Sequence, residues 1–442
     1  MRFLNKVFFR LLTVGFFFII SSTPLSAQYT LNKGYDNIEI RGSVTSLFKH
    51  RWYPDSAEYS IEKQHKNLMR LKDARIRLKG SSMKSKFKYE LHLDFANLAN
   101  NSNQPEVPLL DGYVTYCGPL DVTLGYTKLP FSRESMTPII YSPWLKRSMI
   151  VDEGQSRRDV GIHLEKGFLS DKINVYASYV NGLPEISKQQ DDSLGYELVT
   201  RIDLAYPTKM KYRAVDLSRS HIPVVSIGSS MRRSHKGQIY DADDETIFNG
   251  VDGVKQSISG DLAIMYKGFS VLVERHHIRY SLDEIALSLE QQDQLANYPH
   301  LDFVFPSFPF TYMIGDDVVT PDFYSQGMVY QLTFFAKKYN SVLSLRYDWA
   351  NINFHTDKNY LVTMEGPNGE LLYPTRMPYE DGKKEKTIAL AYNYRFNNHL
   401  SVLKFQLSRT IFDGFDNFGS NYDYSSRPKM IEIRLGLQYI IG

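Results

Sequence analysis

The chain has 442 residues, and its 52 Lys and Arg slightly outnumber its 49 Asp and Glu, which gives a formal net charge of +3. Arg2, Lys6 and Arg10 supply three of these cations near the start, so the remainder is close to neutral, which argues against nucleic-acid binding. The single cysteine, Cys117, cannot form an internal disulfide. The 31 Tyr and 26 Phe, in a chain of mean hydropathy -0.34, are typical of amphipathic strands with aromatic girdles rather than of a helical bundle.

Residues 1–27 have the layout of a secretory signal peptide. Basic residues precede an apolar run, and the small residue Ala27 then offers a cleavage site before Gln28. The alternative, an N-terminal membrane anchor, is disfavoured because the apolar run after Arg10 is too short to span a bilayer. We expect export through this signal and one remaining domain, 28–442, which has no further run of about 20 apolar residues that could form a transmembrane helix.

Sixteen segments of the chain alternate between apolar and polar residues, the pattern of amphipathic strands. The clearest is 87–95, where Lys88, Glu90, His92 and Asp94 occupy one face and apolar residues the other. The predicted strands are 37–52, 67–79, 87–95, 109–117, 120–129, 158–166, 171–181, 197–206, 222–233, 255–266, 269–280, 326–337, 341–352, 385–396, 400–411 and 429–441.

Long polar connections alternate with short turns along these strands. The long ones are 54–66, 97–108, 130–157, 182–196, 234–254, 281–325, 353–384 and 412–428. Outer-membrane barrels have this alternation of connections, with long extracellular loops, short periplasmic turns and both termini in the periplasm. We therefore predict an all-β protein, a transmembrane antiparallel β-barrel of sixteen strands with an inward-folded third extracellular loop. The connection 207–221 is long for a turn and is either a periplasmic excursion or a wrongly assigned strand. A secreted protein of two β-sandwiches is the alternative fold.

The last strand keeps its alternation almost to the final residue. Ends of chains usually fray unless the structure needs them, and in lipid only a closed barrel satisfies every backbone group. We therefore expect 429–441 to close the barrel. The residues predicted to face lipid are Ile431, Ile433, Leu435, Leu437, Tyr439 and Ile441, and those predicted to face the lumen are Glu432, Arg434 and Gln438.

The connection 130–157 is the best candidate for a constriction loop. Pro130, Pro138 and Pro143 prevent a continuous strand, and Ile139, Ile140, Tyr141, Trp144 and Leu145 form apolar patches that would be costly on a wet surface. Folding the loop into the barrel hides them and narrows the lumen. Basic residues exceed acidic ones here by one, through Arg133, Lys146, Arg147 and Arg157, and Arg158 adds one more. Such rings of cations favour anions, but the same cations could instead pair with neighbouring acids to fix the loop.

Strand parity gives three further candidates for the lumen wall. Arg75 and Arg77 alternate with Ile76 and Leu78, and Arg395 lies between Tyr394 and Phe396. These arginines could equally be ordinary solvated wall residues.

Four stretches of the chain resemble the phosphate-selective porins O and P. They are "LKDARIRLKG" (71–80), "LDGYVTY" (110–116), "VTLGYTKLPFSRESMTP" (122–138) and "KRSMIVDEGQSRRDVGIHL" (146–164). The resemblance implies a homotrimeric porin whose third loop folds into the pore and whose basic residues line a path for small anions such as phosphate. The positions carried over from the family are Lys128, Pro130, Phe131, Glu134, Arg147, Arg158, Asp159 and Gly161. The expected constriction consists of Lys128, Arg133, Arg147, Arg157, Arg158 and Asp159. This chain has Ser156-Arg157-Arg158-Asp159 where relatives often have Pro-Gly-Arg-Asp, and Ile441-Gly442 where an aromatic residue is usual.

The leading interpretation is a passive, water-filled pore in the bacterial outer membrane, surrounded by lipid and inserted by the barrel-assembly machinery, without a cofactor or a metal. It is anion-preferring and a candidate for phosphate selectivity; a general non-selective porin is the alternative. An outer-membrane barrel enzyme, a protease or lipase, is disfavoured because His163 and the His276-His277 pair have no recognisable partner motif, and adjacent strand residues point to opposite faces. A gated transporter would need an N-terminal plug, for which 28–36 is too short.

Overall fold

The computed structural model describes residues 29–33, 36–52, 65–96, 109–152, 157–182, 196–236, 253–282, 312–314, 317–319, 323–354, 361–365, 371–376, 383–396, 401–413 and 429–441. The predicted signal peptide and most of the extracellular loops lie outside these residues. Among the described residues, no helix is both long enough and apolar enough to cross a membrane.

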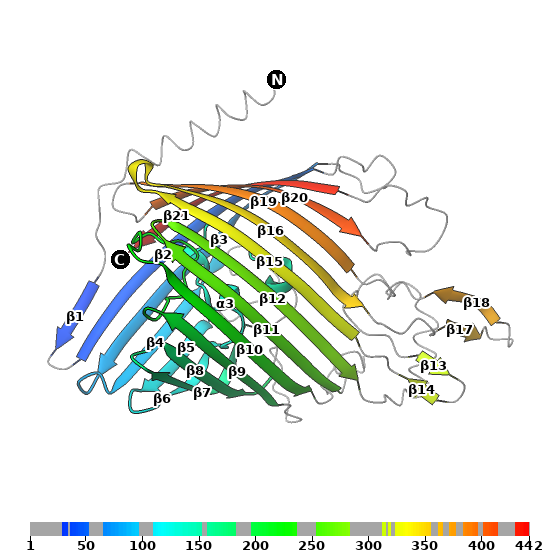
Figure 1. The fold of residues 1–442 in the computed structure, drawn as a ribbon, viewed down its shortest axis with the longest axis horizontal. Coiled ribbons are helices and arrows are strands. Elements are labelled where there is room, and N and C mark those ends of the chain that lie inside the picture. Colours follow the sequence, from blue (N-terminus) through cyan, green and yellow to red (C-terminus); the bar gives the residue numbers. More distant parts are fainter. Residues whose placement is uncertain are drawn as a thin grey trace, which may run out of the picture.

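The described strands form a closed antiparallel barrel of sixteen strands, in which each strand pairs with its neighbour in the chain and β21 pairs with β2 (Figure 1). The barrel strands are β2 (Asp36–Trp52), β3 (His65–Ser82), β4 (Phe87–Asp94), β5 (Leu109–Tyr116), β6 (Asp121–Lys128), β7 (Arg158–Phe168), β8 (Ile173–Val180), β9 (Tyr196–Tyr206), β10 (Val224–Lys236), β11 (Gly253–Tyr266), β12 (Phe269–Leu282), β15 (Phe323–Ala336), β16 (Ser341–Phe354), β19 (Lys383–Arg395), β20 (Ser401–Asp413) and β21 (Lys429–Ile441).

The predicted sixteen-stranded barrel is confirmed. Every predicted strand overlaps an observed one, and the ends differ by at most three residues, as where the strand expected from residue 326 begins at Phe323. The connection 207–223 joins β9 to β10 without a further barrel strand, so it is an excursion and not a wrongly assigned strand. The soluble sandwich alternative is excluded because the sheet closes on itself through β2 and β21.

Five short strands were not predicted. β1 (Tyr29–Lys33) pairs with the first residues of β2, and two small hairpins, β13 (Tyr312–Ile314) with β14 (Asp317–Val319) and β17 (Leu361–Glu365) with β18 (Leu371–Arg376), lie in the long connections. The hairpins lie beyond the ends of the barrel strands (Figure 1). Strands of three to six residues carry too few alternations to be recognised from sequence.

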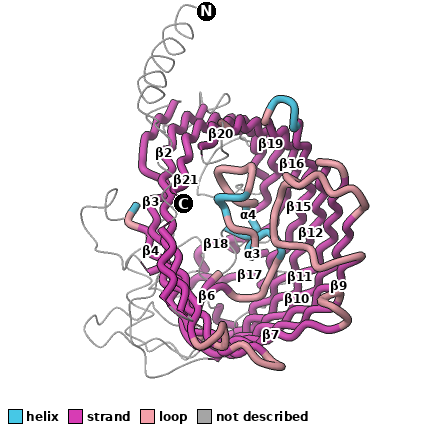
Figure 2. Tube along the Cα trace, turned by 90° about the vertical axis from the view of Figure 1, so that its left-hand side faces the viewer, coloured by secondary structure: helices cyan, strands magenta, loops and turns pink. Residues whose placement is uncertain are grey.

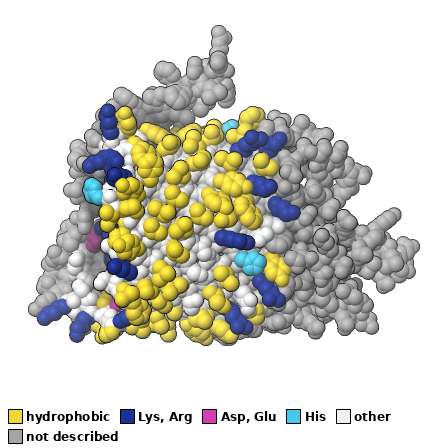
Figure 3. Space-filling view, in the orientation of Figure 1, with side chains coloured by type: hydrophobic (Ala, Val, Ile, Leu, Met, Phe, Trp, Pro, Cys, Tyr) yellow, Lys and Arg dark blue, Asp and Glu magenta, His cyan; other side chains and the backbone are white. Residues whose placement is uncertain are grey.

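The outer face of the barrel is apolar and the inner face polar. On β16, Leu343, Leu345 and Tyr347 are exposed, whereas Ser344 and Arg346 between them are buried. Figure 3 shows apolar side chains spread over the outer surface, with Lys and Arg concentrated toward its two ends. This arrangement suits a surrounding bilayer, because the hydrocarbon region excludes charge and the headgroup regions accept it.

Candidate functional site

The third long connection between barrel strands, residues 129–157, is called loop 3 here, and its described part is 129–152 and 157. It contains α3 (Arg133–Met136), the 3-10 turn η1 (Ile139–Tyr141) and α4 (Met149–Asp152). Prolines before α3 and η1 end strand pairing. Ser132 caps α3, with its hydroxyl accepting from Ser135 N at 3.1 Å. α3 and α4 lie inside the ring of strands (Figure 2).

Apolar side chains of loop 3 pack against inner-face residues of several strands. Phe131 belongs to a buried cluster with Val180 of β8 and Val199 of β9, and α4 packs on Ile278, Val329 and Ala350 of β12, β15 and β16. Trp144, which is 1% exposed, packs on Ala389 and Ala391 of β19. These contacts remove Phe131 and Trp144 from water, and Leu145 is buried with them, whereas Ile139, Ile140 and Tyr141 are half-buried.

Polar contacts extend the attachment round the wall to β21. Trp144 Nε1 donates to Gln331 at 2.8 Å, Leu145 N donates to Gln406 at 3.1 Å, and Gln438 Nε2 donates to Ile140 O at 3.3 Å. Lys404 Nζ donates to Ser142 O at 2.8 Å. The inner faces of β8 to β21, which loop 3 contacts, are called the covered wall below; those of β2 to β7 are called the open arc.

Arg133 attaches loop 3 to the covered wall by a buried ion pair. Its Nε lies 2.7 Å from Asp261 Oδ1, and its Nη2 donates to Ser226 Oγ at 2.6 Å. Arg201 shares the same acids, since its Nη2 lies 2.6 Å from Asp203 and 2.7 Å from Asp261. Two arginines and two aspartates therefore balance each other, as buried charges must.

Arg147 and Glu134 organise loop 3 internally. Arg147 donates to the carbonyl oxygens of Glu134 and Thr137, at the C-terminal end of α3. The Glu134 carboxylate accepts from Ser148 N and Ser148 Oγ and lies 3.7 Å from Arg346 Nη1. Burial raises the pKa of Glu134 above its ordinary value, and Arg346 opposes that rise. Arg133 and Arg147, both predicted to line the constriction, are thus used in attaching and shaping the loop.

The open arc carries partly exposed cations. Arg77 pairs with Glu90 at 2.7 Å with its side chain 33% exposed, whereas Arg133 on the covered wall is 3% exposed. Arg75 pairs with Asp94 at 2.7 Å and also with Asp73. The structure therefore brings Arg75 and Arg77 to the inner face, each beside acids.

Three basic residues lie at the two ends of loop 3, where it follows β6 and precedes β7. They are Lys128, Arg157 and Arg158. Lys128 Nζ donates to Met136 O at 3.4 Å. Arg158 pairs with Asp111 at 3.0 Å. Lys72 of β3, a position that was not predicted, is a further basic residue of the arc, and its Nζ lies 3.5 Å from Asp73.

The other predicted residues occupy structural positions. Asp159 accepts from Val160 N and Gly182 N at 2.7 Å and so fixes the backbone at the start of β7. Arg395 lies two residues after the buried Asn393, on the same face of β19, and is half-buried at the end of that strand. On β21, Glu432, Arg434 and Gln438 are buried, and Leu435, Leu437 and Tyr439 alternate with them. The side chain of Ile441 lies outside the described part.

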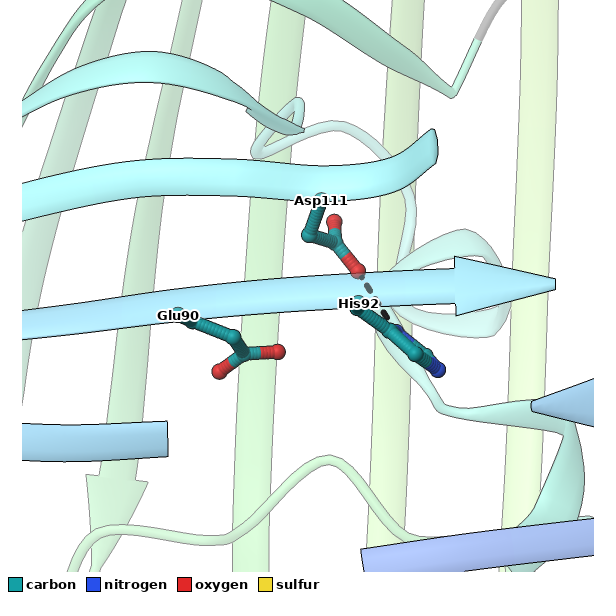
Figure 4. A group of neighbouring side chains, drawn as sticks. All are labelled: Glu90, His92 and Asp111. Atoms are coloured by element: carbon teal, nitrogen blue, oxygen red, sulfur yellow. Dashed lines mark hydrogen bonds and ion pairs between the residues drawn. The ribbon is translucent and has the colours of Figure 1, made fainter. Parts of the chain in front are cut away.

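Glu90, His92 and Asp111 are the one group of potential metal ligands among the described residues (Figure 4). Both Glu90 oxygens accept from Arg77, and Tyr113 Oη donates to the same carboxylate at 2.9 Å. Asp111 pairs with Arg158 and lies 2.9 Å from His92 Nδ1. Because arginines already neutralise both carboxylates, the group does not fit a cation.

Ser132, Glu274 and His276 lie together but not in a catalytic order. The Ser132 hydroxyl donates to Glu274, and His276 Nε2 lies 2.6 Å from the same carboxylate. A nucleophilic serine needs the imidazole, not the acid, as its direct partner. His276 is buried and His277 exposed, as expected for neighbours in a strand. This cluster joins loop 3 to the wall.

Residues 53–217 match the family described as phosphate-selective porin O and P, which confirms the resemblance seen in the sequence. The match includes loop 3 and most of the open arc. No curated protein matches the sequence.

Solved structures of outer-membrane proteins are similar in fold. The outer membrane channel DcaP of Acinetobacter baumannii has a TM-score of 0.56 at 12% identity, covering 94% of this chain and 100% of that chain. A loop-deletion mutant of the outer membrane protein OmpT of Vibrio cholerae has a TM-score of 0.53 at 9% identity, covering 92% and 99%. OmpT in its trimer form has a TM-score of 0.52 at 9% identity, with the same coverage. At these identities the similarity establishes the barrel fold.

Proposed function

We propose that this outer-membrane porin, which resembles the phosphate-selective porins O and P through residues 53–217, is a passive, water-filled channel that prefers small anions. The observation that supports the proposal is that the inner surface of the barrel has two parts, the covered wall and the open arc. Loop 3 attaches to the covered wall through buried, balanced charges, and a group of partly exposed cations stands on the open arc. These cations are Lys72, Arg75, Arg77, Lys128, Arg157 and Arg158, and the acids beside them are Asp73, Glu90, Asp94, Asp111 and Asp159.

A small surplus of cations is sufficient for anion preference in a narrow lumen. Charges next to a low-dielectric wall act more strongly on a passing ion than the same charges in bulk water. Lys128, Arg157 and Arg158 lie at the two ends of loop 3, where the loop joins the barrel wall. Arginine also presents a planar fork that suits phosphate oxygens, which makes phosphate a candidate solute.

A general, weakly selective porin is the second candidate. It is favoured by the ion pairs of Arg75, Arg77 and Arg158, because each of these cations has a carboxylate within 3.0 Å that cancels much of its field. Neither candidate requires a catalytic group. The proposal also includes export through residues 1–27, insertion by the barrel-assembly machinery and assembly into a homotrimer. The trimer form of the structurally similar OmpT supports the homotrimer.

Phosphate competition in planar bilayers tests the solute. Chloride conductance is measured at constant ionic strength while phosphate replaces an inert anion in steps, with sulfate as the matched control. A phosphate-preferring channel loses chloride conductance in a saturable way at phosphate concentrations where sulfate has little effect. Equal effects of the two anions would limit the proposal to a general anion preference, and no effect of either would contradict an anion site in the channel.

A further inference from the structure

The connection 207–223 between β9 and β10 folds back into the barrel. Met210 is buried with Ala263 of β11 and Leu272 of β12. Val215 is buried with Phe335 of β15 and Val342 of β16. All four partners lie on the inner face, so the connection covers part of the lumen wall near the end of the barrel that carries the short turns.

Asp216 holds this connection in a defined shape. Its carboxylate accepts from Ser218 Oγ and Ser220 Oγ at 3.0 Å each and from Gly268 N at 3.0 Å, and its own N donates to Ser270 Oγ at 2.8 Å. A connection with this many internal and wall contacts is an ordered element rather than a loose turn.

Tyr212 joins the connection to loop 3. Its hydroxyl donates to Asp203, and the guanidinium groups of Arg133 and Arg201 lie 5.1 and 5.7 Å from its ring centroid. Burial raises the pKa of Tyr212, which keeps the phenol neutral as a donor. The two elements, one entering from each end of the barrel, therefore meet at Arg133.

Arg213, the next residue, is exposed. Its guanidinium lies 5.7 Å from the ring centroid of Tyr141 on loop 3. It lines a pocket between the connection and loop 3 together with Arg147, Ser142 and Gln331. Arg133 and Arg201 are buried, whereas Arg213 is exposed.

We propose that residues 207–220 are a second constriction element and that Arg213 is its selectivity-determining residue, presenting a cation to anions that pass loop 3. This inference rests on the proposed function. It explains why one short-turn position of the barrel carries a long segment: the segment supplies a wall contact and a positive charge beside Tyr141 of loop 3.

The first experiment measures the anion-to-cation permeability ratio of Arg213→Gln, with Arg213→Lys as the charge-preserving variant. The matched control is Lys209→Gln, which removes the same charge from the same connection but from a side chain that pairs with Glu165 at 2.9 Å. We expect the ratio to fall about twofold to threefold in Arg213→Gln, the effect of one charge several Å from a permeating ion in water, and to remain native in Arg213→Lys. Equal ratios in native protein and Arg213→Gln, or an equal fall in Lys209→Gln, would overturn the assignment.

A second experiment separates this inference from the proposed anion preference. In a Cys117→Ser background, Arg213→Cys is treated during recording with positive or negative methanethiosulfonate reagents of similar size. If Arg213 lines the path, the single-channel conductance changes in a step after modification, even in a channel that shows no anion preference. An unchanged conductance after modification that mass spectrometry verifies would contradict the inference, whatever the selectivity of the native channel.

Discussion

Arginines of the lumen differ in function according to what surrounds them. Arg133 is enclosed by Asp261, Ser226 and the ring of Tyr212, so it stabilises the attachment of loop 3 rather than facing the solute. Arg77 has a similar ion pair but a side chain that is one-third exposed. Exposure and not residue type therefore decides which cations can act on a permeating ion.

Replacing Arg133 by Met should free loop 3 from β11. The change leaves Asp203 and Asp261 with Arg201 alone, and removing one partner of a buried pair costs about 3–5 kcal/mol. We expect noisier single-channel currents and a lower unfolding midpoint in urea. Asp261→Asn added to Arg133→Met restores the charge balance and should recover part of the stability. A quiet, native-like current from Arg133→Met would show that this ion pair does not hold the loop.

Charge removal on the open arc should reduce anion preference. Lys72→Gln with Arg158→Gln deletes two accessible cations, and the matched control, Lys84→Gln with Lys86→Gln, deletes two cations from the short turn between β3 and β4. We expect a lower anion-to-cation permeability ratio in the first variant and a native ratio in the second. If both variants retain the native ratio, cations on the open arc do not determine selectivity.

Loop 3 is the element that shapes the lumen, and Trp144 is its largest fully buried side chain. The indole packs on β19, bonds Gln331, and lies under the Arg346 guanidinium, 4.6 Å from the ring centroid. Its contacts with the covered wall leave the open arc as the side of the lumen that carries accessible charge.

Trp144→Ala should detach the middle of loop 3, since truncating a buried Trp costs about 3–5 kcal/mol. A detached loop gives a variable conductance and becomes accessible to protease in the folded barrel. Trp144→Phe keeps most of the apolar contact, loses the hydrogen bond to Gln331 and should be intermediate. Native protease resistance in Trp144→Ala would mean that the remaining contacts suffice to hold the loop.

Strand β21 closes the barrel, so a charge on its outer face should impair assembly. Leu435 lies near the middle of the strand and pairs with Phe48 and Phe405 in register. Leu435→Arg costs about 2–4 kcal/mol if the position lies near the bilayer midplane. We expect little heat-modifiable, folded protein in the outer membrane, whereas Leu435→Ala should assemble. Normal assembly of Leu435→Arg would place this side chain away from lipid.

The barrel strands could be predicted because each carries several alternations, and the turn parity then determined the topology. Pairing of individual side chains could not be predicted in this way. Arg147 and Arg158 lie close together in sequence, yet one caps α3 and the other pairs with Asp111 of β5, a partner that only the closed barrel brings near. The inward fold of 207–223 was missed for the same reason, because its apolar residues show no regular alternation, and Met210 and Val215 pack on strands far along the chain.

At the scale of the whole molecule, the inner surface has two halves with different functions. The covered wall binds loop 3 and the connection 207–223 through buried clusters and balanced ion pairs. The open arc carries a group of partly exposed cations, and Arg213 is exposed on the connection 207–223. Because the chain as a whole is near neutral, no global field supports anion preference, and selectivity must arise from this local arrangement.

The reversal potential of the native channel in a potassium chloride gradient tests the central claim most directly. Refolded protein is inserted in a planar bilayer between chambers of unequal salt concentration, and the zero-current voltage is recorded from single channels. Excess cations on the open arc predict a reversal potential with the sign of chloride preference, shrinking as the ionic strength rises and screening increases. A reversal potential at zero, or one with the sign of potassium preference, would contradict the account.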